Sequence, residues 1–447
     1  MKNTFRGGVH PAGYKKLSRD VPLRLFNPRG EMVFPLQQHI GKPAKPIVKK
    51  NDPVLAGQRI AEADGFVSAH VYSSCSGTVK AIEKRRVLSG QMTDCIVIDN
   101  DGAFTPAADY TRRDDPAKLT EEEILQRIQD AGIVGLGGAG FPTHVKLRPK
   151  SPQEIRCLII NGAECEPYLT CNDQLMRSCA QEIVEGTELV LRLLPNAQVV
   201  VAIENNKPEA IKAMKEASRG HGRIRVMGLK TKYPQGGERS LISVIAGVDF
   251  PLSKLPADVG CIVQNVGTVY AIQRAVLYRE PLFTHCFTVT GDAVANPGNY
   301  IVRDGTSFAE LVEEAGGLKG NLKKALIGGP MMGIAVGSLE VPIQKQNNGL
   351  VLLSADPVEQ AEKVATACLH CGRCTTVCPV GLMPQLMSDA AELGNYERYE
   401  KKLFGLECIQ CGSCTYICPA KRPLMQTFKQ AKAEITALKK REGGGTK

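Results

Sequence analysis

The sequence predicts a protein of several domains that combine α/β and α+β folds. Its 447 residues exceed the size at which one hydrophobic core stops growing, and an apolar share of 43% supports packed cores. Strand and helix signals alternate in the middle of the chain, while short strand-like runs dominate before it. The expected parts are residues 1–110, 111–280, 281–345 and 357–435.

Residues 1–110 are expected to form a small β domain, because short apolar runs are punctuated by Gly, Pro and Asn-Asp turns. The expected strands are Val33–Leu36, Val54–Gly57, Phe66–Val71, Gly77–Ile82 and Cys95–Asp99. Their order resembles the barrel-sandwich hybrid fold of biotinyl and lipoyl domains, which carry a cofactor on a lysine at a hairpin tip. The corresponding tip, Ala63–Phe66, has no lysine. We therefore expect docking rather than a covalent swinging arm.

Residues 111–280 are expected to form an α/β sheet. Thr120 and Glu123 make a capping box that opens an amphipathic helix over 121–131. Strand-like runs follow at 157–160 and 199–203, with helical patterns at 180–194 and 208–217. Strands that alternate with helices indicate an α/β sheet.

Residues 281–345 return to short strands with one helix from Ser307 to Ala315, which predicts a small α+β module. Residues 357–435 are expected to be helical around their cysteines. The N-terminal segment has no apolar stretch typical of a secretory signal, so we expect the chain to stay in the cytosol. The uncharged run Ala325–Leu339 is too short to cross a bilayer, so any membrane association is expected to be peripheral.

Half of the sixteen cysteines lie in two Cys-x-x-Cys-x-x-Cys-x-x-x-Cys-Pro runs. Reduced cytosolic thiols favour metal ligation over disulfides. In two-cluster ferredoxins each run supplies three ligands to one 4Fe-4S cluster and its fourth cysteine to the other. One cluster is therefore expected on Cys368, Cys371, Cys374 and Cys418, and the other on Cys408, Cys411, Cys414 and Cys378. Two runs with matching Pro379 and Pro419 disfavour the alternative of a zinc site. The remaining eight cysteines are expected to be small buried packing residues.

The segment from Gly135 to Gly140 satisfies G-x-G-x-x-G. A Rossmann fingerprint should follow a strand and open a helix, but this loop follows a predicted helix and runs into Phe141 and Pro142. The residues by themselves leave two interpretations open, a glycine-rich anion loop and a structural turn.

The longer segment Gly135–Thr143, with Lys146 beyond it, resembles the flavin loop of the NADH-oxidising flavoprotein subunit of respiratory complex I. Asn161–Pro167, Tyr233–Glu238 and Asn265–Thr268 resemble that family's flavin and nicotinamide segments in the same order. The resemblance implies that non-covalent FMN is lined by Gly135, Gly137, Gly138, Gly140, Lys146, Asn161, Glu164, Tyr233, Gly236, Asn265 and Thr268. The residues that would face NAD(H) are Phe141, Glu166 and Glu238.

The chemistry of these residues suits those roles. Glycine amides and Lys146 suit a phosphate, asparagines can hydrogen-bond the polar edge of a flavin, and Phe141 can stack on a ring. The chain also departs from the complex I flavoprotein. Ala163 stands where that protein has Asp, Gln264 replaces an Asn, and two cysteine runs replace a single-cluster site.

Gly7–Pro11, the barrel-sandwich region, the flavin segments and the two cysteine runs together resemble the family of C subunits of the Rnf complex, over nearly the whole chain. The segment from Phe287 to Gly317 resembles that family's SLBB β-grasp module. The resemblance implies a ferredoxin:NAD+ oxidoreductase coupled to Na+ or H+ transport. Electrons would pass singly through the clusters to FMN, which exchanges a hydride with NAD(H), so no catalytic side chain is expected.

The resemblance also implies partners and a location. The expected partners are the other Rnf subunits, namely the iron-sulfur B subunit and the membrane subunits, with ferredoxin reached indirectly. The chain is expected at the cytoplasmic face of the bacterial cell membrane, held there through its partners only. The net charge of +10 is offset by about −2 for each cluster with its thiolates. Since no nucleic-acid-binding motif is present, no nucleic acid partner is expected.

Two kinds of alternative share these features. A soluble flavin and iron-sulfur reductase has the same segments. The cobalamin reductase of diol-metabolising microcompartments resembles the chain only from the glycine loop onward, whereas the electron carrier of proline reductase shares the N-terminal layout. A non-catalytic electron-transfer adaptor would have the clusters without a working NAD(H) site. Phe141, Glu166 and Glu238 distinguish the adaptor from a catalytic protein.

Overall fold

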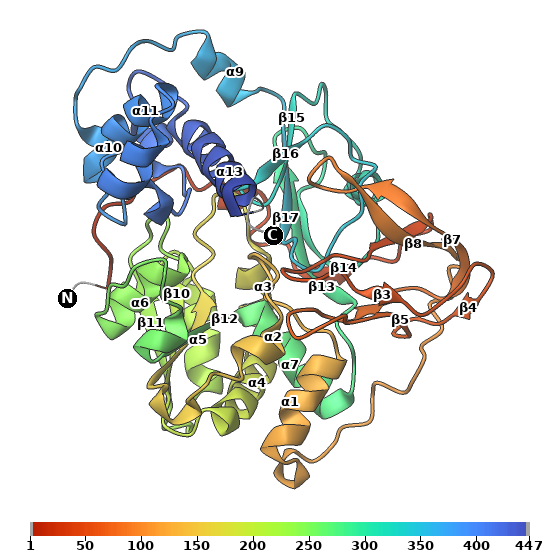
Figure 1. Ribbon diagram of the computed structural model, residues 1–447. Coiled ribbons are helices and arrows are strands. Elements are labelled where there is room, and N and C mark those ends of the chain that lie inside the picture. Colours follow the sequence, from red (N-terminus) through yellow and green to blue (C-terminus); the bar gives the residue numbers. More distant parts are fainter. Residues whose placement is uncertain (1–2, 444–447) are drawn as a thin grey trace. The chain divides into compact units, whose positions relative to one another are not determined.

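The computed structural model describes residues 3–443, with side chains described as far as residue 441 (Figure 1). Met1 and Lys2, which belong to the N-terminal segment that lacks an apolar stretch, lie outside this range. The chain forms two compact units. Unit 1 consists of Met1–Ala12, Leu229–Val259 and Asp356–Lys447, and unit 2 consists of Gly13–Gly228 and Gly260–Ala355.

Two small sheets of unit 2 confirm the predicted barrel-sandwich fold. The first is antiparallel and contains, in order, β2 (Met32–Pro35), β8 (Met92–Asn100), β7 (Gly77–Arg86) and β4 (Pro53–Val54). The second contains β3 (Lys45–Pro46), β5 (Arg59–Glu62) and β6 (Val71–Tyr72). Apolar side chains of both sheets, among them Phe34, Ile60 and Ile96, are buried in one cluster. Facing sheets that share one core are the defining feature of a sandwich.

One expected strand of this region is largely wrong. Of Phe66–Val71 only Val71 lies in a strand, and residues 63–70 form a loop. The loop is closed by side chains rather than by a strand ladder, since Ala63 donates its N–H to His70 Nδ1 and Asp64 donates its N–H to Ser68 Oγ, both at 3.0 Å. Local side-chain hydrogen bonds of this kind compete with sheet pairing. The other four expected strands each overlap a strand of the structure.

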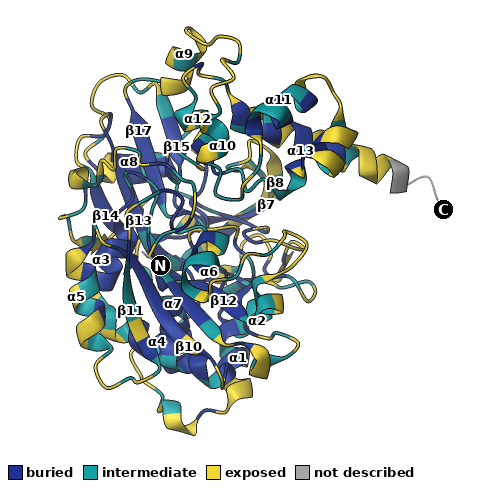
Figure 2. Ribbon diagram, turned by 90° about the vertical axis from the view of Figure 1, so that its left-hand side faces the viewer, coloured by how far each residue is buried: buried dark blue, intermediate teal, exposed yellow. Residues whose placement is uncertain are grey.

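The predicted α/β sheet is present in unit 2. Its strands run in the order β11 (Ile224–Leu229), β10 (Gln198–Glu204), β9 (Cys157–Gly162) and β12 (Cys261–Asn265), and β9 is parallel to both β10 and β12. Strands β10 and β12 are almost wholly buried (Figure 2), as parallel strands covered on both faces are. The helices around this sheet are α1 (Glu121–Asp130), α2 (Thr143–Lys146), α3 (Cys171–Ser178), α4 (Ala180–Leu193), α5 (Pro208–Ala217) and α7 (Val266–Tyr278).

The local sequence signals of this region are confirmed. The capping box of α1 is complete, because Glu123 donates its N–H to Thr120 Oγ1 and accepts the Thr120 N–H on its carboxylate. The strands expected at 157–160 and 199–203 are β9 and β10, and the helices expected at 180–194 and 208–217 are α4 and α5.

The third sheet of unit 2 is six-stranded and mixed. Its order is β1 (Leu23–Leu25), β14 (Gly298–Arg303), β13 (Thr284–Gly291), β17 (Gly349–Leu353), β15 (Lys324–Ile327) and β16 (Ile334–Val336). Helix α8 (Phe308–Glu314) begins after Ser307, whose Oγ accepts the N–H of Glu310 at 3.2 Å, and confirms the expected helix. Phe287, Tyr300 and Phe308 are fully buried in the core of this sheet. Strand β1 comes from the N-terminal part of the chain and pairs with β14 in parallel.

Unit 1 is mainly helical, as expected for its C-terminal part. Its α-helices are α6 (Glu238–Ala246), α9 (Pro357–Glu362), α10 (Arg373–Thr376), α11 (Pro384–Glu392), α12 (Ser413–Ile417) and α13 (Leu424–Gly443). Met387, Tyr399 and Phe428 form the centre of its apolar core. Within the described residues, no helix combines the length and the apolar character that a membrane crossing needs. Of the eight cysteines outside the two runs, four are buried, namely Cys75, Cys95, Cys171 and Cys261.

Candidate functional site

The glycine loop of unit 2 is a closed turn. Gly135 donates its N–H to the Phe141 carbonyl at 2.9 Å, and Leu136 donates its N–H to Thr268 Oγ1 on α7 at 3.0 Å. Gly137 and Gly140 have left-handed φ values of +66° and +68°, which favour glycine. A Cβ atom at Gly138 would meet no other atom within 4 Å. The middle of the loop therefore offers backbone that a ligand can approach closely.

The predicted asparagines stand side by side at the carboxyl edge of the parallel sheet. Asn161 at the end of β9 is in register with Asn265 at the end of β12. Asn265 caps α7 by accepting the Gly267 N–H at 2.7 Å, and a Cβ atom on Gly137 would lie 3.7 Å from Asn265 Nδ2. Lys146 Nζ donates to the Val263 carbonyl of β12 at 3.1 Å. The glycine loop, Lys146 and both asparagines thus meet at the edge where α/β sheets bind ligands.

The loop that follows β9 is held by a buried lysine, Lys207, and a half-buried one, Lys15. Lys15 Nζ donates to the backbone carbonyls of Glu164 at 2.9 Å and Glu166 at 3.0 Å, and Lys207 Nζ donates to the Ala163 carbonyl at 2.6 Å. Glu164 has a left-handed φ of 47° and a side chain only 2% exposed. Burial raises the pKa of Glu164 to about 7 and lowers the pKa of Lys15. Sequence reasoning missed both lysines, because neither lies near this loop in the chain.

The carboxylate of Glu166, predicted to face NAD(H), binds backbone in this structure. It accepts the N–H of Met331 at 3.1 Å and that of Met332 at 2.9 Å. Both residues belong to the turn between β15 and β16. Phe141, its expected companion, is half-buried after the glycine loop.

Three predicted residues, Tyr233, Gly236 and Glu238, belong to unit 1. Tyr233 is 1% exposed, and its hydroxyl donates to the Cys411 carbonyl at 2.9 Å. Glu238 is the first residue of α6, next to Gly236 and Gly237.

In the part of the chain that the structure describes, two buried glutamines have amide atoms without a hydrogen-bond partner. They support a polar ligand at the sheet edge of unit 2 and at the Tyr233–Glu238 segment of unit 1. Within the described residues, neither amide atom of Gln235 nor the Nε2 atom of Gln264 has a hydrogen-bond partner, although both side chains are buried. Gln235 lies in the Tyr233–Glu238 segment of unit 1, and Gln264 precedes Asn265 in unit 2. Because unpaired buried amides are costly, residues of this kind fit a polar group such as a flavin.

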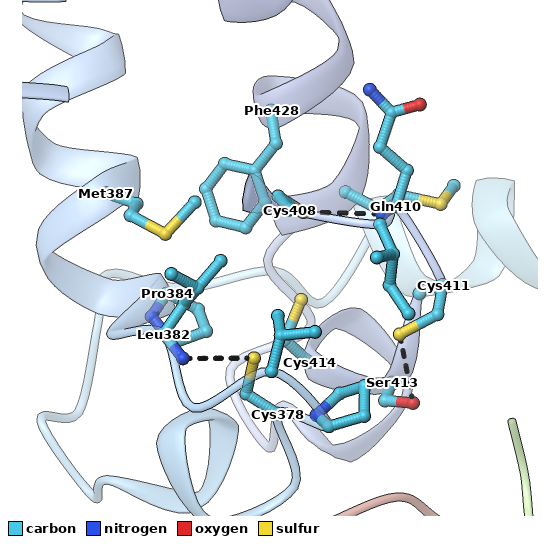
Figure 3. Close-up of a pocket in the computed structure, with 15 residues that line it drawn as sticks. Cys378, Leu382, Pro384, Met387, Cys408, Gln410, Cys411, Ser413, Cys414 and Phe428 are labelled. Carbon is cyan, nitrogen blue, oxygen red and sulfur yellow. Dashed lines mark hydrogen bonds between the residues drawn. The ribbon is translucent and has the colours of Figure 1, made fainter. Parts of the chain in front are cut away.

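Two pockets of unit 1 collect the eight cysteines of the runs. One is lined by Cys378, Cys408, Cys411 and Cys414, here called the Cys408 set (Figure 3). The other is lined by Cys368, Cys371, Cys374 and Cys418, here called the Cys368 set. Each pocket takes three cysteines from one run and the fourth from the other, which is the crossed grouping that the spacing predicts.

The chemistry of both sets fits iron-sulfur clusters. Backbone N–H groups already point at ligand sulfurs, from Gln410 to Cys408 Sγ and from His370 to Cys368 Sγ, both at 3.4 Å. Burial raises the pKa of the Cys408 thiol to about 11, and a coordinated metal would deprotonate it. Within the part of the chain that the structure describes, no three His, Cys, Asp or Glu side chains converge closely enough to hold a single metal ion. Four cysteines around one pocket match the four thiolates that a 4Fe-4S cluster needs.

A chain that contains both this sheet edge and two four-cysteine pockets has the parts of a flavin and iron-sulfur oxidoreductase. Family models match it in the same order as the predicted parts. They are the RnfC barrel sandwich hybrid domain at residues 3–103, the Nuo51 FMN-binding domain at 128–274, the SLBB domain at 286–335 and the 4Fe-4S dicluster domain at 361–419. These matches confirm the predicted fold class and the expected cofactors, FMN and two 4Fe-4S clusters.

Similar proteins identify the family. The chain is 41% identical to the C subunit of the proton-translocating ferredoxin:NAD(+) oxidoreductase complex of Clostridium ljungdahlii, over 99% of this chain and 96% of that protein. It is 40% identical to the C subunit of the Na(+)-translocating complex of Acetobacterium woodii, over 98% of each chain. The chain belongs to the family of C subunits of ion-translocating ferredoxin:NAD+ oxidoreductase complexes, the Rnf family, and thus to a multi-subunit complex.

The N-terminal match also bears on the alternatives. A cobalamin reductase resembles the chain only from the glycine loop onward, so the barrel sandwich match at residues 3–103 favours the Rnf family over it. Among solved structures, an NAD+-reducing [NiFe]-hydrogenase in the H2-reduced state is similar with a TM-score of 0.49 and 21% identity, over 74% of this chain and 68% of that one. A likeness this distant says nothing about function.

Proposed function

We propose that this chain is the NAD(H)-reacting part of an ion-translocating ferredoxin:NAD+ oxidoreductase. The observation that carries the proposal is the 41% identity to an Rnf C subunit over 99% of the chain. FMN, when bound, supplies the exchange between single electrons and a hydride. The chain's own residues bind and orient FMN and the nucleotide and hold the clusters.

The flavin-binding roles follow from the sheet edge. The open glycine loop and Lys146 would hold the phosphate, and Asn161 and Asn265 would hydrogen-bond the polar edge of the ring. Glu164, in the loop after β9, accepts the Asn172 N–H at 2.8 Å, and burial raises its pKa to about 7, so it can hold or release a proton there. The roles of the remaining predicted FMN and NAD(H) residues stay proposals, namely Gly135, Gly137, Gly138, Gly140, Phe141, Glu166, Tyr233, Gly236, Glu238 and Thr268.

The Cys368 set and the Cys408 set would each hold one 4Fe-4S cluster. We also retain the limits 1–110, 111–280, 281–345 and 357–435 as proposed domains. The proposed partners are the iron-sulfur B subunit and the membrane subunits of the complex, with ferredoxin reached through a partner. The proposed location is the cytoplasmic face of the cell membrane, through contacts with those partners.

The test is anaerobic addition of NADH to the chain reconstituted with FMN and iron-sulfur clusters. We expect the flavin absorbance to bleach, and absence of bleaching with FMN demonstrably bound would contradict the proposal. A Glu238→Ala variant should bleach at least tenfold more slowly while keeping both clusters. Glu397→Ala is the matched control, because this side chain is 77% exposed and its ion pair with Lys401 contributes little. Loss of clusters in Glu238→Ala would contradict the assigned role of Glu238.

A further inference from the structure

We infer that the Cys408 set is the flavin-side set of the two, and that Tyr233 is the positioning residue that ties it to the flavin-lining segment. The inference rests on the proposed function and concerns the order in which electrons pass. It follows from contacts within unit 1, which joins the Tyr233–Glu238 segment to the cysteine runs.

The first contact is the hydrogen bond of Tyr233. Its hydroxyl donates at 2.9 Å to the backbone carbonyl of Cys411, a member of the Cys408 set. The tyrosine is 1% exposed and Cys411 is 7% exposed, so water does not compete for this bond. Tyr233 lies within the match to the FMN-binding domain, at residues 128–274. One side chain therefore joins a segment of the flavin domain directly to a cluster loop.

The second contact runs through the N-terminal segment to another member of the same set. Val9 and Tyr233 exchange two backbone hydrogen bonds of 2.9 Å, which forms a short antiparallel bridge. The next residue back, Gly8, donates its N–H to the Val377 carbonyl at 2.8 Å, directly before Cys378. A Cβ atom on Gly7 would lie 2.7 Å from the Cys378 carbonyl oxygen. Tyr233 is thus linked to the Cys408 set at both Cys411 and Cys378.

The Cys368 set has different surroundings. Cys371 is exposed, and Leu369, which follows Cys368 in the same run, is 62% exposed. Solvent-exposed ligands are accessible to a partner protein, whereas the buried loop around Cys411 is not. The other three cysteines of each set are of intermediate exposure, so the sets differ at this one ligand, Cys371 against Cys411. At that ligand the Cys368 set is open to a partner protein and the Cys408 set is not.

The number of electrons that NADH releases matches the number that the two clusters accept. Oxidation of NADH to NAD+ releases two electrons and one proton, and each 4Fe-4S cluster accepts one electron. One NADH therefore reduces both clusters, the Cys408 set first and the Cys368 set through it. In the opposite direction an electron enters at the Cys368 set and leaves to the flavin from the Cys408 set.

The order can be tested by removing one cluster at a time with Cys371→Ser and Cys411→Ser in the full chain. Flavin is reduced with NADH, or with light and a sacrificial donor, and the remaining cluster is followed by EPR. We expect the cluster left in Cys371→Ser to be reduced as fast as in the unchanged chain. The cluster left in Cys411→Ser should be reduced at least tenfold more slowly, although its flavin bleaches. The reverse pattern, or equal rates, would overturn the inference.

Photoreduction of the flavin distinguishes a failure of this inference from a failure of the proposed function. If NADH fails to bleach the flavin, the proposed reaction with NAD(H) fails, while photoreduced flavin still reports which cluster receives the electron first. Iron and flavin contents of each variant show that only one cluster is missing.

The positioning role is tested by Tyr233→Phe, which removes the hydroxyl and leaves the ring. We expect an unchanged iron content, an altered EPR line shape for the Cys408 set and, per bound FMN, a several-fold slower reduction of that set by the flavin. Tyr416→Phe is the matched control, because Tyr416 lies in the cysteine run that contains Cys411 but is 47% exposed. An unchanged spectrum and rate in Tyr233→Phe, or the same changes in Tyr416→Phe, would rule out the positioning role.

Discussion

The two cysteine sets of unit 1 share their local geometry. Gly372 and Gly412 occupy the same position in the two runs and have left-handed φ values of 72° and 78°. His370 and Gln410 likewise correspond, with φ values of 51° and 56°, and each directs its N–H to a cysteine sulfur at 3.4 Å. The spacing of the cysteines has thus produced the same loop twice.

The surroundings of the two sets differ. Apolar side chains line both pockets, among them Met387 and Phe428 in the Cys408 pocket and Leu369 and Leu424 in the Cys368 pocket. The cations are placed differently, because Arg422 lines the Cys368 pocket itself whereas Lys432 donates to the backbone carbonyl of Cys408 at 2.7 Å. A cluster becomes more negative when it is reduced, so an apolar site lowers its reduction potential and a nearby cation raises it. We therefore expect the potential of each set to fall when its own cation is removed, Arg422 for the Cys368 set and Lys432 for the Cys408 set. The comparison teaches that the runs determine what is bound, while distant residues determine how each cluster behaves.

The largest expected effect comes from replacing the cysteine that each run supplies to the other run's set. Cys378→Ser and Cys418→Ser should each lower the iron content from about eight to about four per chain, since one cluster is lost. If the sets are crossed, Cys378→Ser removes the EPR signal that Cys411→Ser removes, and Cys418→Ser removes the one that Cys371→Ser removes. If Cys378→Ser instead removes the EPR signal that Cys371→Ser removes, each run holds its own cluster.

A smaller effect on stability should come from replacing either of two glycines by alanine. Both glycines have a left-handed φ, but they differ in the atoms that a Cβ would meet. Gly372→Ala should destabilise its loop by about 1 kcal/mol, because φ is left-handed but a Cβ atom meets nothing within 4 Å. Gly7 has a similar φ of +77°, and in Gly7→Ala the new Cβ atom would lie only 2.7 Å from the Cys378 carbonyl oxygen. This substitution should therefore lower stability by about 3 kcal/mol.

The two glycine variants are distinguished by the rate at which iron is lost to a chelator, followed by EPR. Gly7→Ala should release the iron of the Cys408 set faster and leave the Cys368 set unchanged. Equal rates for the two variants would show that the N-terminal segment does not support the Cys408 set.

The smallest expected effect concerns the electrostatics of the Cys368 set. Arg422 lines its pocket, forms an ion pair with Glu392 and donates to Ser388 Oγ at 3.3 Å. Arg422→Met should lower the midpoint potential of this set by tens of millivolts, where about 59 mV is a tenfold change for one electron. An EPR-monitored redox titration would measure it, with the exposed Lys429→Met as the control for loss of charge. A shift confined to the Cys408 set would contradict the assignment of Arg422.

Much of the fold could be predicted because its signals are local. The capping box at Thr120, the apolar runs of β9 and β10 and the spacing of the cysteines depend on residues only a few positions apart. The strand expected over Phe66–Val71 was mostly wrong because the apolar pattern of this segment is overridden by backbone hydrogen bonds that the side chains of Ser68 and His70 accept. Lys15 and Lys207 could not be predicted, because their partners are carbonyls far along the chain.

The sequence by itself determined the class of the chain, the order of its parts and the grouping of cysteines that two crossed clusters require. These follow from short-range stereochemistry, since a thiolate must lie within bonding distance of its iron and a loop of three residues allows that. Only the tertiary structure decided that Gly7–Val9 and Tyr233 join the cysteine runs in unit 1, and that Cys411 is buried whereas Cys371 is exposed. Such contacts depend on the free energy of packing segments that are remote in sequence, for which no local pattern exists.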